Sequence, residues 1–324
     1  MRRRRSGSFL HIVLLFVPLA MTAVAGKGRA HAASKLQVVV TVGDLGALAR
    51  EVLGDAGEVT VLAKPTQDPH FVDARPNLIL SLNRADALVS MGLDYEIGWL
   101  PVLVRGARNP RLQSGEPGNI VASTMIVVQE IPTQKIDRSM GDIHPGGNPH
   151  FTLDPRNASR IAQGMATRFA ALAPGNGPVY QKNAAALVAR LTSRERKWQA
   201  AIAGFRGTPV VTYHRSFVYL TSWLGLVETD TLEPKPGIPP NAAHIGRVIE
   251  EMRARKVPLI LQERWYPSSV AEQVASQTGA HLVLIPGMTA ESARYDDHID
   301  EIVTSITTAL AAAKNSAPAQ AHKP

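Results

Sequence analysis

The segment from Val179 to Phe205 constrains the fold of this 324-residue chain more than any other. It has no proline and no glycine before Gly204, and apolar or aromatic residues recur at helical spacing with charged residues between them. At about 1.5 Å per residue, such a helix is about 40 Å long, which exceeds the diameter of one small domain. We therefore expect two halves, with this helix either as a spine that joins them or as a surface helix packed on one of them.

On either side of this segment, short apolar runs alternate with helical patterns. The predicted strands lie at 36–42, 58–62 and 85–90 before it, and at 209–213, 259–261 and 281–285 after it. Strand–helix–strand order is typical of parallel α/β sheets. We expect an N-terminal α/β lobe at 33–175, a linking helix at 176–205, a C-terminal α/β lobe at 206–313 and a disordered tail at 314–324.

Residues 1–32 have the composition of a secretory signal peptide. Four arginines at 2–5 precede an apolar run at 9–20, which is too short to span a membrane. Small residues at 23–25 and at 30–32 both fit the cleavage pattern, and we prefer the second site. An uncleaved signal anchor is the alternative.

Charge and cysteine content narrow the chemistry of the mature chain. Residues 1–32 hold six of the 35 basic residues and no acidic ones, which leaves 29 basic against 27 acidic residues. A net charge of +2 does not indicate nucleic-acid binding. The sequence has no cysteine, so a lipid anchor on cysteine and a thiolate metal ligand are both excluded. We expect a soluble, monomeric periplasmic protein whose metal ligands are His, Asp, Glu or water.

Three histidines stand in polar loops. His70 and His214 each follow a predicted strand, and His150 lies in a Gly- and Pro-rich loop at 141–155 that cannot form a helix or a central strand. Open α/β sheets bind ligands at the carboxyl ends of their strands, so the three side chains can converge if the halves face each other. Three neutral imidazoles favour zinc, with other transition metals open. The alternative is that these histidines merely face water.

The motifs around these residues resemble those of the zinc/manganese-binding solute-binding proteins of bacterial ABC importers (the ZnuA/TroA-like family). They are Asp68-Pro69-His70, Gly147-Asn148-Pro149-His150-Phe151-Thr152-Leu153-Asp154-Pro155 and Tyr213-His214-Arg215-Ser216-Phe217-Val218-Tyr219-Leu220. Their order, their spacings and the long central helix also match, over about residues 35–313. The resemblance implies two α/β lobes joined by one long rigid helix, with a metal ion between them and His70, His150 and His214 as its ligands.

The resemblance fails at one position. Many family members have a carboxylate just after the last strand, where this chain has Pro286-Gly287-Met288. Glu263, at the end of the preceding strand, is the best substitute as a fourth ligand. Alternatively, Glu263 only forms a hydrogen bond with a ligand histidine or a backbone amide, and water is the fourth ligand. His144 is either an auxiliary ligand or a loop residue. The remaining candidates, which we expect to be structural or solvated, are His244, His281 and His298, with Asp296 or Asp297 as the runner-up site residue.

The expected function is capture of zinc, or alternatively manganese, as a transported substrate and its delivery to an inner-membrane ABC permease. Asp154, Glu263 or backbone carbonyls are expected to orient the imidazoles, and metal affinity should fall as the pH drops through about 6.5. A rigid spine would limit hinge closure, so loop ordering would distinguish loaded from empty forms. The sequence has no His-Glu-x-x-His motif, which would indicate a zinc-dependent hydrolase. A secreted zinc hydrolase and an adhesin on the same fold remain alternatives.

Overall fold

Two four-stranded parallel sheets form the centres of two α/β lobes in the computed structural model, which describes residues 7, 35–134, 141 and 143–316. The strand orders are β2-β1-β3-β4 and β6-β5-β7-β8. The strands are β1 Leu36–Val40, β2 Gly57–Val61, β3 Ala87–Ser90, β4 Asn119–Val121, β5 Pro209–Thr212, β6 Val227–Thr231, β7 Leu259–Glu263 and β8 His281–Ile285. Parallel strands covered on both faces are near-continuous apolar runs, as β3 and β7 are, and this confirms the predicted α/β fold.

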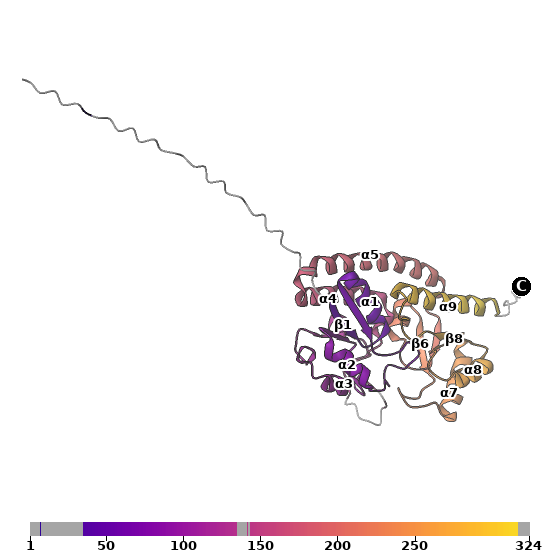
Figure 1. The fold of residues 1–324 in the computed structure, drawn as a ribbon. Coiled ribbons are helices and arrows are strands. Elements are labelled where there is room, and N and C mark those ends of the chain that lie inside the picture. Colours follow the sequence, from indigo (N-terminus) through magenta and orange to yellow (C-terminus); the bar gives the residue numbers. More distant parts are fainter. Residues whose placement is uncertain (1–6, 8–34, 135–140, 142, 317–324) are drawn as a thin grey trace, which may run out of the picture. The chain divides into compact units, whose positions relative to one another are not determined.

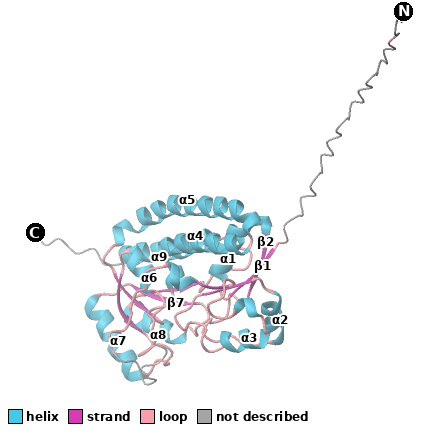
Figure 2. Cartoon of the chain, turned by 90° about the vertical axis from the view of Figure 1, so that its left-hand side faces the viewer, coloured by secondary structure: helices cyan, strands magenta, loops and turns pink. Residues whose placement is uncertain are grey.

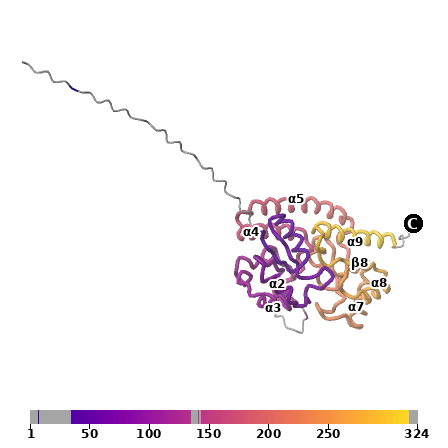
Figure 3. The backbone as a smooth tube through the Cα atoms, viewed as in Figure 1, coloured from indigo at the N-terminus to yellow at the C-terminus, as the bar shows by residue number. Residues whose placement is uncertain are grey.

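Helices pack around both sheets, as Figure 2 shows. They are α1 Gly43–Leu53, α2 Pro76–Arg84, α3 Leu100–Ala107, α4 Pro155–Leu172, α5 Gly177–Ile202, α6 Val218–Leu224, α7 Ala242–Arg255, α8 Ser269–Thr278 and α9 Tyr295–Ser316. The tube in Figure 3 separates the lobes by colour: the first sheet and its helices are indigo to magenta, and the second set is orange to yellow. Each lobe is thus built from one continuous part of the chain, apart from the long helix α5.

Helix α5 contacts elements of both lobes. Its 26 residues correspond to about 39 Å, and it lies against α1 and α4 of the first lobe and α9 of the second (Figure 1). Tyr180, Leu187 and Leu191 are buried on its inner face, at the spacing that places side chains on one side of a helix. A single hydrophobic cluster contains buried residues from both sheets. The long segment therefore joins the lobes, as predicted for a spine, and a shared core holds them together.

Ion pairs fix α9 on α5. Asp296 is fully buried, and its carboxylate accepts hydrogen bonds from Arg190 Nε at 3.0 Å and from Arg294 Nε at 3.2 Å. Arg190 also pairs with Glu51 of α1, so one guanidinium links helices of both lobes. Asp297 lies 3.7 Å from Arg194 and is exposed. Asp296 and Asp297 belong to this helix interface, and neither is among the residues that gather around the three loop histidines.

Asp44 stands at the start of the first helix, where an aspartate is able to act as a cap, but it has a different role. Helix α1 begins one residue earlier, at Gly43, and the capping position is Val42. The Asp44 carboxylate instead accepts hydrogen bonds from the backbone N and hydroxyl of Thr289, both at 2.7 Å, and from the Thr152 hydroxyl at 2.7 Å. This buried carboxylate joins both lobes. It stabilises the fold more than a helix cap would, because it satisfies three buried hydrogen-bond donors that would otherwise be unpaired.

Other boundaries also differ from prediction. Strand β6, Val227–Thr231, was not predicted; it lies at a sheet edge and contains charged residues. Helix α9 extends through Ser316, three residues into the expected tail, and the rest of that tail lies outside the described residues. The predicted signal peptide also lies outside them, except for Gly7. Among the described helices, none is both long and apolar enough to cross a membrane.

Candidate metal centre

His70 is oriented by a turn that its own neighbours form. It lies in the loop between β2 and α2, and the Asp68 carboxylate accepts a hydrogen bond from the His70 backbone N at 2.9 Å and faces the ring Nδ1 at 2.8 Å. The second Asp68 oxygen accepts from the Tyr266 hydroxyl at 3.3 Å. Because Nδ1 is occupied, Nε2 is the free ring atom, and it is buried without a hydrogen-bond partner. This is the state of an imidazole that is ready to bind a cation.

His150, in the loop at 141–155, is oriented in the same way by a neighbouring residue. The Asn148 side-chain oxygen accepts from the His150 backbone N at 3.0 Å and lies 3.0 Å from the ring Nδ1. Proline stands between the Asx residue and the histidine in both cases, at Pro69 and Pro149, and fixes the backbone of the turn. Burial, together with the neighbouring histidines, holds the pKa of His150 well below 6.5, so its ring is neutral at neutral pH.

His214 is oriented by a residue from a different strand. It follows β5, and its Nδ1 lies 2.7 Å from Oε2 of Glu233, which follows the neighbouring strand β6. Burial lowers the pKa of His214, but the hydrogen bond and charge of Glu233 outweigh it, so the pKa lies above 6.5. Glu233 also accepts from the Gly237 backbone N at 3.0 Å, which fixes the carboxylate in the proline-rich loop.

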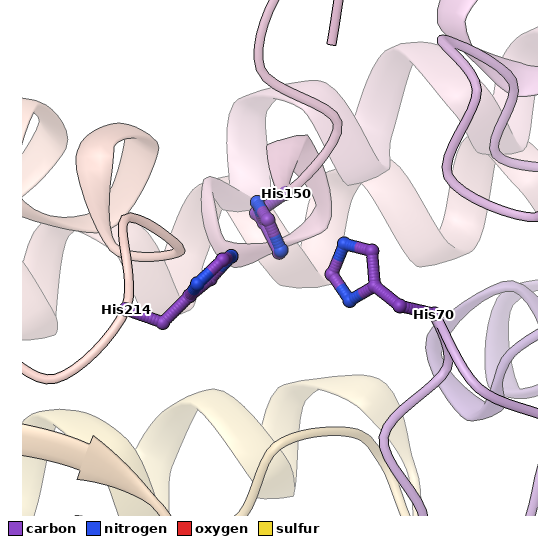
Figure 4. A group of neighbouring side chains, drawn as sticks. All are labelled: His70, His150 and His214. Atoms are coloured by element: carbon purple, nitrogen blue, oxygen red, sulfur yellow. The ribbon is translucent and has the colours of Figure 1, made fainter. Parts of the chain in front are cut away.

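The three histidines converge as predicted. One ligand atom from each of His70, His150 and His214 lies within 4.8 Å of the other two, and the ring centroids are 5.4 to 5.6 Å apart. Figure 4 shows the three rings facing a common centre. In each case the Nδ1 atom is held by a side-chain oxygen, which leaves the Nε2 atoms for a metal. The donor set therefore fits a transition-metal ion that accepts imidazole ligands.

Glu263 lies beside this group but not within it. It ends β7, is buried, and accepts a hydrogen bond from the Ser216 hydroxyl through Oε1, while Oε2 has no partner among the described residues. Burial raises its pKa to about 7, against the opposing charge of His214. It lines one cavity together with His150. Its predicted role as a fourth ligand stays a prediction.

The other histidines, and Asp154, lie at different places relative to the three converging rings. The ring of His144 lies 5.5 Å from that of His70, whereas His244 binds the Thr231 carbonyl oxygen at 2.8 Å and His298 lies 3.8 Å from Asp44. His281 begins β8, away from the other rings. Asp154 was expected to orient an imidazole, and this is wrong. Its carboxylate caps α4 by accepting a hydrogen bond from the backbone N of Arg156 at 2.9 Å.

Sequence reasoning missed the three residues that do orient the rings. Asp68 and Asn148 had a local signal, because Asx-Pro-His occurs twice and Asx side chains form turns with the backbone two residues further on. Glu233 had no such signal, since it lies 19 residues after His214 and approaches it only through pairing of β5 with β6.

The profile of one protein family matches residues 38–311, which is most of the chain. That family is described as the periplasmic zinc-uptake complex component A, ZnuA. The chain belongs to the ZnuA family. ZnuA proteins are components of zinc-uptake complexes by this description, and the three converging imidazoles of the present chain are consistent with such a role.

Similar proteins and structures agree with this membership in the ZnuA family. The chain is 23% identical over 271 residues to the zinc-binding lipoprotein AdcA of Streptococcus pneumoniae, covering 83% of the chain but only 53% of AdcA, about half of its length. It is 23% identical over 284 residues to the high-affinity zinc uptake system protein ZnuA of Bacillus subtilis, covering 86% of the chain and 87% of that protein. A zinc-bound ZnuA deletion mutant shares the fold with a TM-score of 0.71 at 22% identity, over 85% of the chain and 98% of that structure. Other similar proteins have manganese or iron in their names.

Proposed function

We propose that this chain captures a divalent transition-metal ion outside the cytoplasm and delivers it, as cargo, to the permease of an ABC importer. The observation that carries the proposal is the set of three converging imidazoles, each oriented through Nδ1 by a side-chain oxygen. We propose His70, His150 and His214 as the ligands. Glu263 is retained as a candidate fourth ligand.

Zinc is the cargo that this donor set favours. Imidazole nitrogen suits zinc, whereas manganese prefers carboxylate, carbonyl and water oxygens. The two closest carboxylates, Asp68 and Glu233, already accept hydrogen bonds from ring nitrogens, which makes them orienting groups rather than ligands. Manganese remains the alternative, because proteins named for manganese are among the similar sequences.

The same contacts argue for binding and release rather than catalysis. A zinc hydrolase needs a general base beside the metal-bound water. Asp68 and Glu233, the two carboxylates that contact the proposed ligand rings, are occupied by the imidazoles. Membership in a transport family supports the same conclusion, so we propose that the chain is not an enzyme. No specific observation favours an adhesin.

The shared core and α5 suggest how the ion is held and released. Asp44, Arg190 and the hydrophobic cluster tie the lobes together, which opposes a wide hinge motion. We propose that loops around the site, rather than whole lobes, change on loading. Residues 1–32 would act as a cleaved export signal, and the mature chain, with lobes at 33–175 and 206–313, would work in the periplasm as a monomer.

Metal analysis of the purified mature chain, followed by competition titration with a chromophoric chelator, tests this proposal. We expect about one tightly bound zinc per chain, and a loss of affinity of roughly two orders of magnitude or more in His150→Ala, because one of three buried ligands is removed. His281→Ala removes a histidine away from the site and should bind zinc like the wild type. A mature protein that binds no zinc or manganese contradicts the proposal. Unchanged affinity in Glu263→Gln would remove Glu263 from the ligands.

A further inference from the structure

A strained turn lies beside the metal centre and has no role in the function proposed so far. Gly92, Leu93 and Asp94 have positive φ angles of 80°, 56° and 60°. The left-handed region is unfavourable for residues with a side chain, and especially for a bulky one such as leucine. The buried carboxylate of Glu96 stabilises the turn by accepting from the backbone N of Met91 at 2.7 Å and of Gly92 at 3.2 Å. The fold thus maintains this conformation with a dedicated buried group.

The turn presents a backbone carbonyl to His144. The ring of His144 donates a hydrogen bond to the Leu93 backbone, and because Nε2 has no partner, the donor is Nδ1. The loop approaches closely at this point, since a side chain at Gly146 would begin 2.9 Å from the Leu93 side chain. In His144, as in the three proposed ligands, Nδ1 is occupied by an oxygen, and its Nε2, like that of His70, is buried and has no hydrogen-bond partner among the described residues.

The ring of His144 lies at a ligand-like distance from one of the three proposed ligands. Its ring centroid lies 5.5 Å from that of His70, within the range of 5.4 to 5.6 Å that separates the three proposed ligands from one another. It lies 6.5 Å from the His150 ring, so an inward shift of about 1 Å would make that separation equal to the others. His144 lines one cavity with His150 and His214, and a second cavity with His70.

We propose that His144 is the fourth ligand of the captured ion, which completes a site of four imidazoles. This inference rests on the proposed function and refines the identity of the site. It explains why a strained turn and a buried glutamate hold the Leu93 carbonyl in place, since a carbonyl that accepts from Nδ1 fixes the ring of a metal ligand. Glu263 is the alternative for the fourth position, and one of its two carboxylate oxygens already accepts a hydrogen bond from the Ser216 hydroxyl. Four nitrogen ligands favour zinc over manganese.

Cobalt(II) substitution tests this proposal, because the visible spectrum of the bound ion reports its ligands. In a site of four imidazoles, azide finds no open position, so the spectrum of the wild type should not change when azide is added. His144→Ala should open one position: azide should alter its spectrum, free imidazole should restore the wild-type spectrum, and zinc affinity should fall at least about tenfold. His144→Gln, which keeps a polar side chain in the loop, should resemble His144→Ala. His281→Ala is the matched control and should behave as the wild type.

Each other outcome overturns the proposal in a distinguishable way. An azide-sensitive wild-type spectrum would mean that solvent holds the fourth position. Azide sensitivity in Glu263→Gln, with none in His144→Ala or in the wild type, would assign that position to Glu263. A wild type that binds neither cobalt nor zinc would contradict the proposed function itself, and with it this inference.

Discussion

Replacing Glu233 by glutamine tests whether orientation of His214 contributes to metal affinity. The carboxylate accepts from His214 Nδ1 at 2.7 Å and from the Gly237 backbone N at 3.0 Å. A glutamine has the same shape, and its amide oxygen can still accept these bonds, so the fold should be retained. What is lost is the negative charge that makes Nε2 a better electron donor to the metal.

Two effects of opposite sign set the magnitude. Loss of a group that orients a ligand typically weakens metal binding by about 10- to 100-fold, or about 1.4–2.7 kcal/mol at 1.36 kcal/mol per tenfold. Protonation of His214 competes with metal binding, and it does so more in the wild type than in the variant. Burial lowers the pKa of His214, but Glu233, with smaller contributions from Glu263 and Asp68, raises it above 6.5. When the pH falls below this raised pKa the His214 ring is mostly protonated, and it must lose that proton before it binds metal.

The wild type therefore loses affinity between pH 8 and pH 6, whereas Glu233→Gln, with a lower pKa at His214, loses less. We expect the variant to bind zinc about 10- to 100-fold more weakly at pH 8, and the gap between variant and wild type to narrow at pH 6. Competition titration at both pH values measures this, with Glu272→Gln, an exposed glutamate on α8, as the control. An unchanged affinity at pH 8, or a gap that widens at pH 6, would refute the reasoning.

Three further substitutions test stability. Burial raises the pKa of Glu228 to about 7 from 4.5, so below pH 4.5 both folded and unfolded chains carry its proton, and between pH 4.5 and 7 stability falls as the pH rises. Glu228→Gln should raise the free energy of unfolding by about 1–3 kcal/mol at pH 8 and change it little at pH 4.5, as measured by urea unfolding; an equal effect at both values would contradict this. In Gly287→Ala the new Cβ would lie 1.8 Å from the Trp265 ring, so we expect a loss of about 1–3 kcal/mol and a lower Tm. Gly246→Ala, where nothing lies within 4 Å of the new Cβ in helix α7, should instead be neutral or stabilising, and the opposite order would show that this packing argument is wrong.

Much of the architecture could be predicted because it follows from local pattern. Apolar runs gave the buried strands such as β1 and β7, and the uninterrupted helical spacing gave α5. Strand β6 could not be predicted, because Val227–Thr231 contains charged residues and is a sheet edge that needs only one partner. The first turn of α9 is hard to predict, because Tyr295 is followed by two aspartates that pair with Arg190 and Arg194 of α5 only in the folded chain.

The convergence of the three histidines was predictable for a similar reason. His70 and His214 follow strands of two parallel sheets, and the carboxyl ends of such strands are where ligands bind. The roles of Asp44 and Asp154 were harder to assign. Asp154 precedes α4 and caps it. Asp44 lies in the first turn of α1, but its carboxylate instead accepts a hydrogen bond from Thr289, 245 residues away. Local sequence gives the possible partners of a carboxylate, and tertiary packing selects among them.

The four rings around the centre depend on local and distant structure to different degrees. His70 and His150 obtain their orientation from an Asx residue two positions earlier, so this part of the site needs only a short turn to form. His214 needs the pairing of β5 with β6 to bring Glu233 beside it, and His144 needs the strained Leu93 turn. An ion held by all four therefore links two self-contained turns to two orientations set by distant parts of the fold. Loading should then order the loop of His144 more than that of His70, which is the direction of change expected if loops, rather than lobes, mark the loaded form.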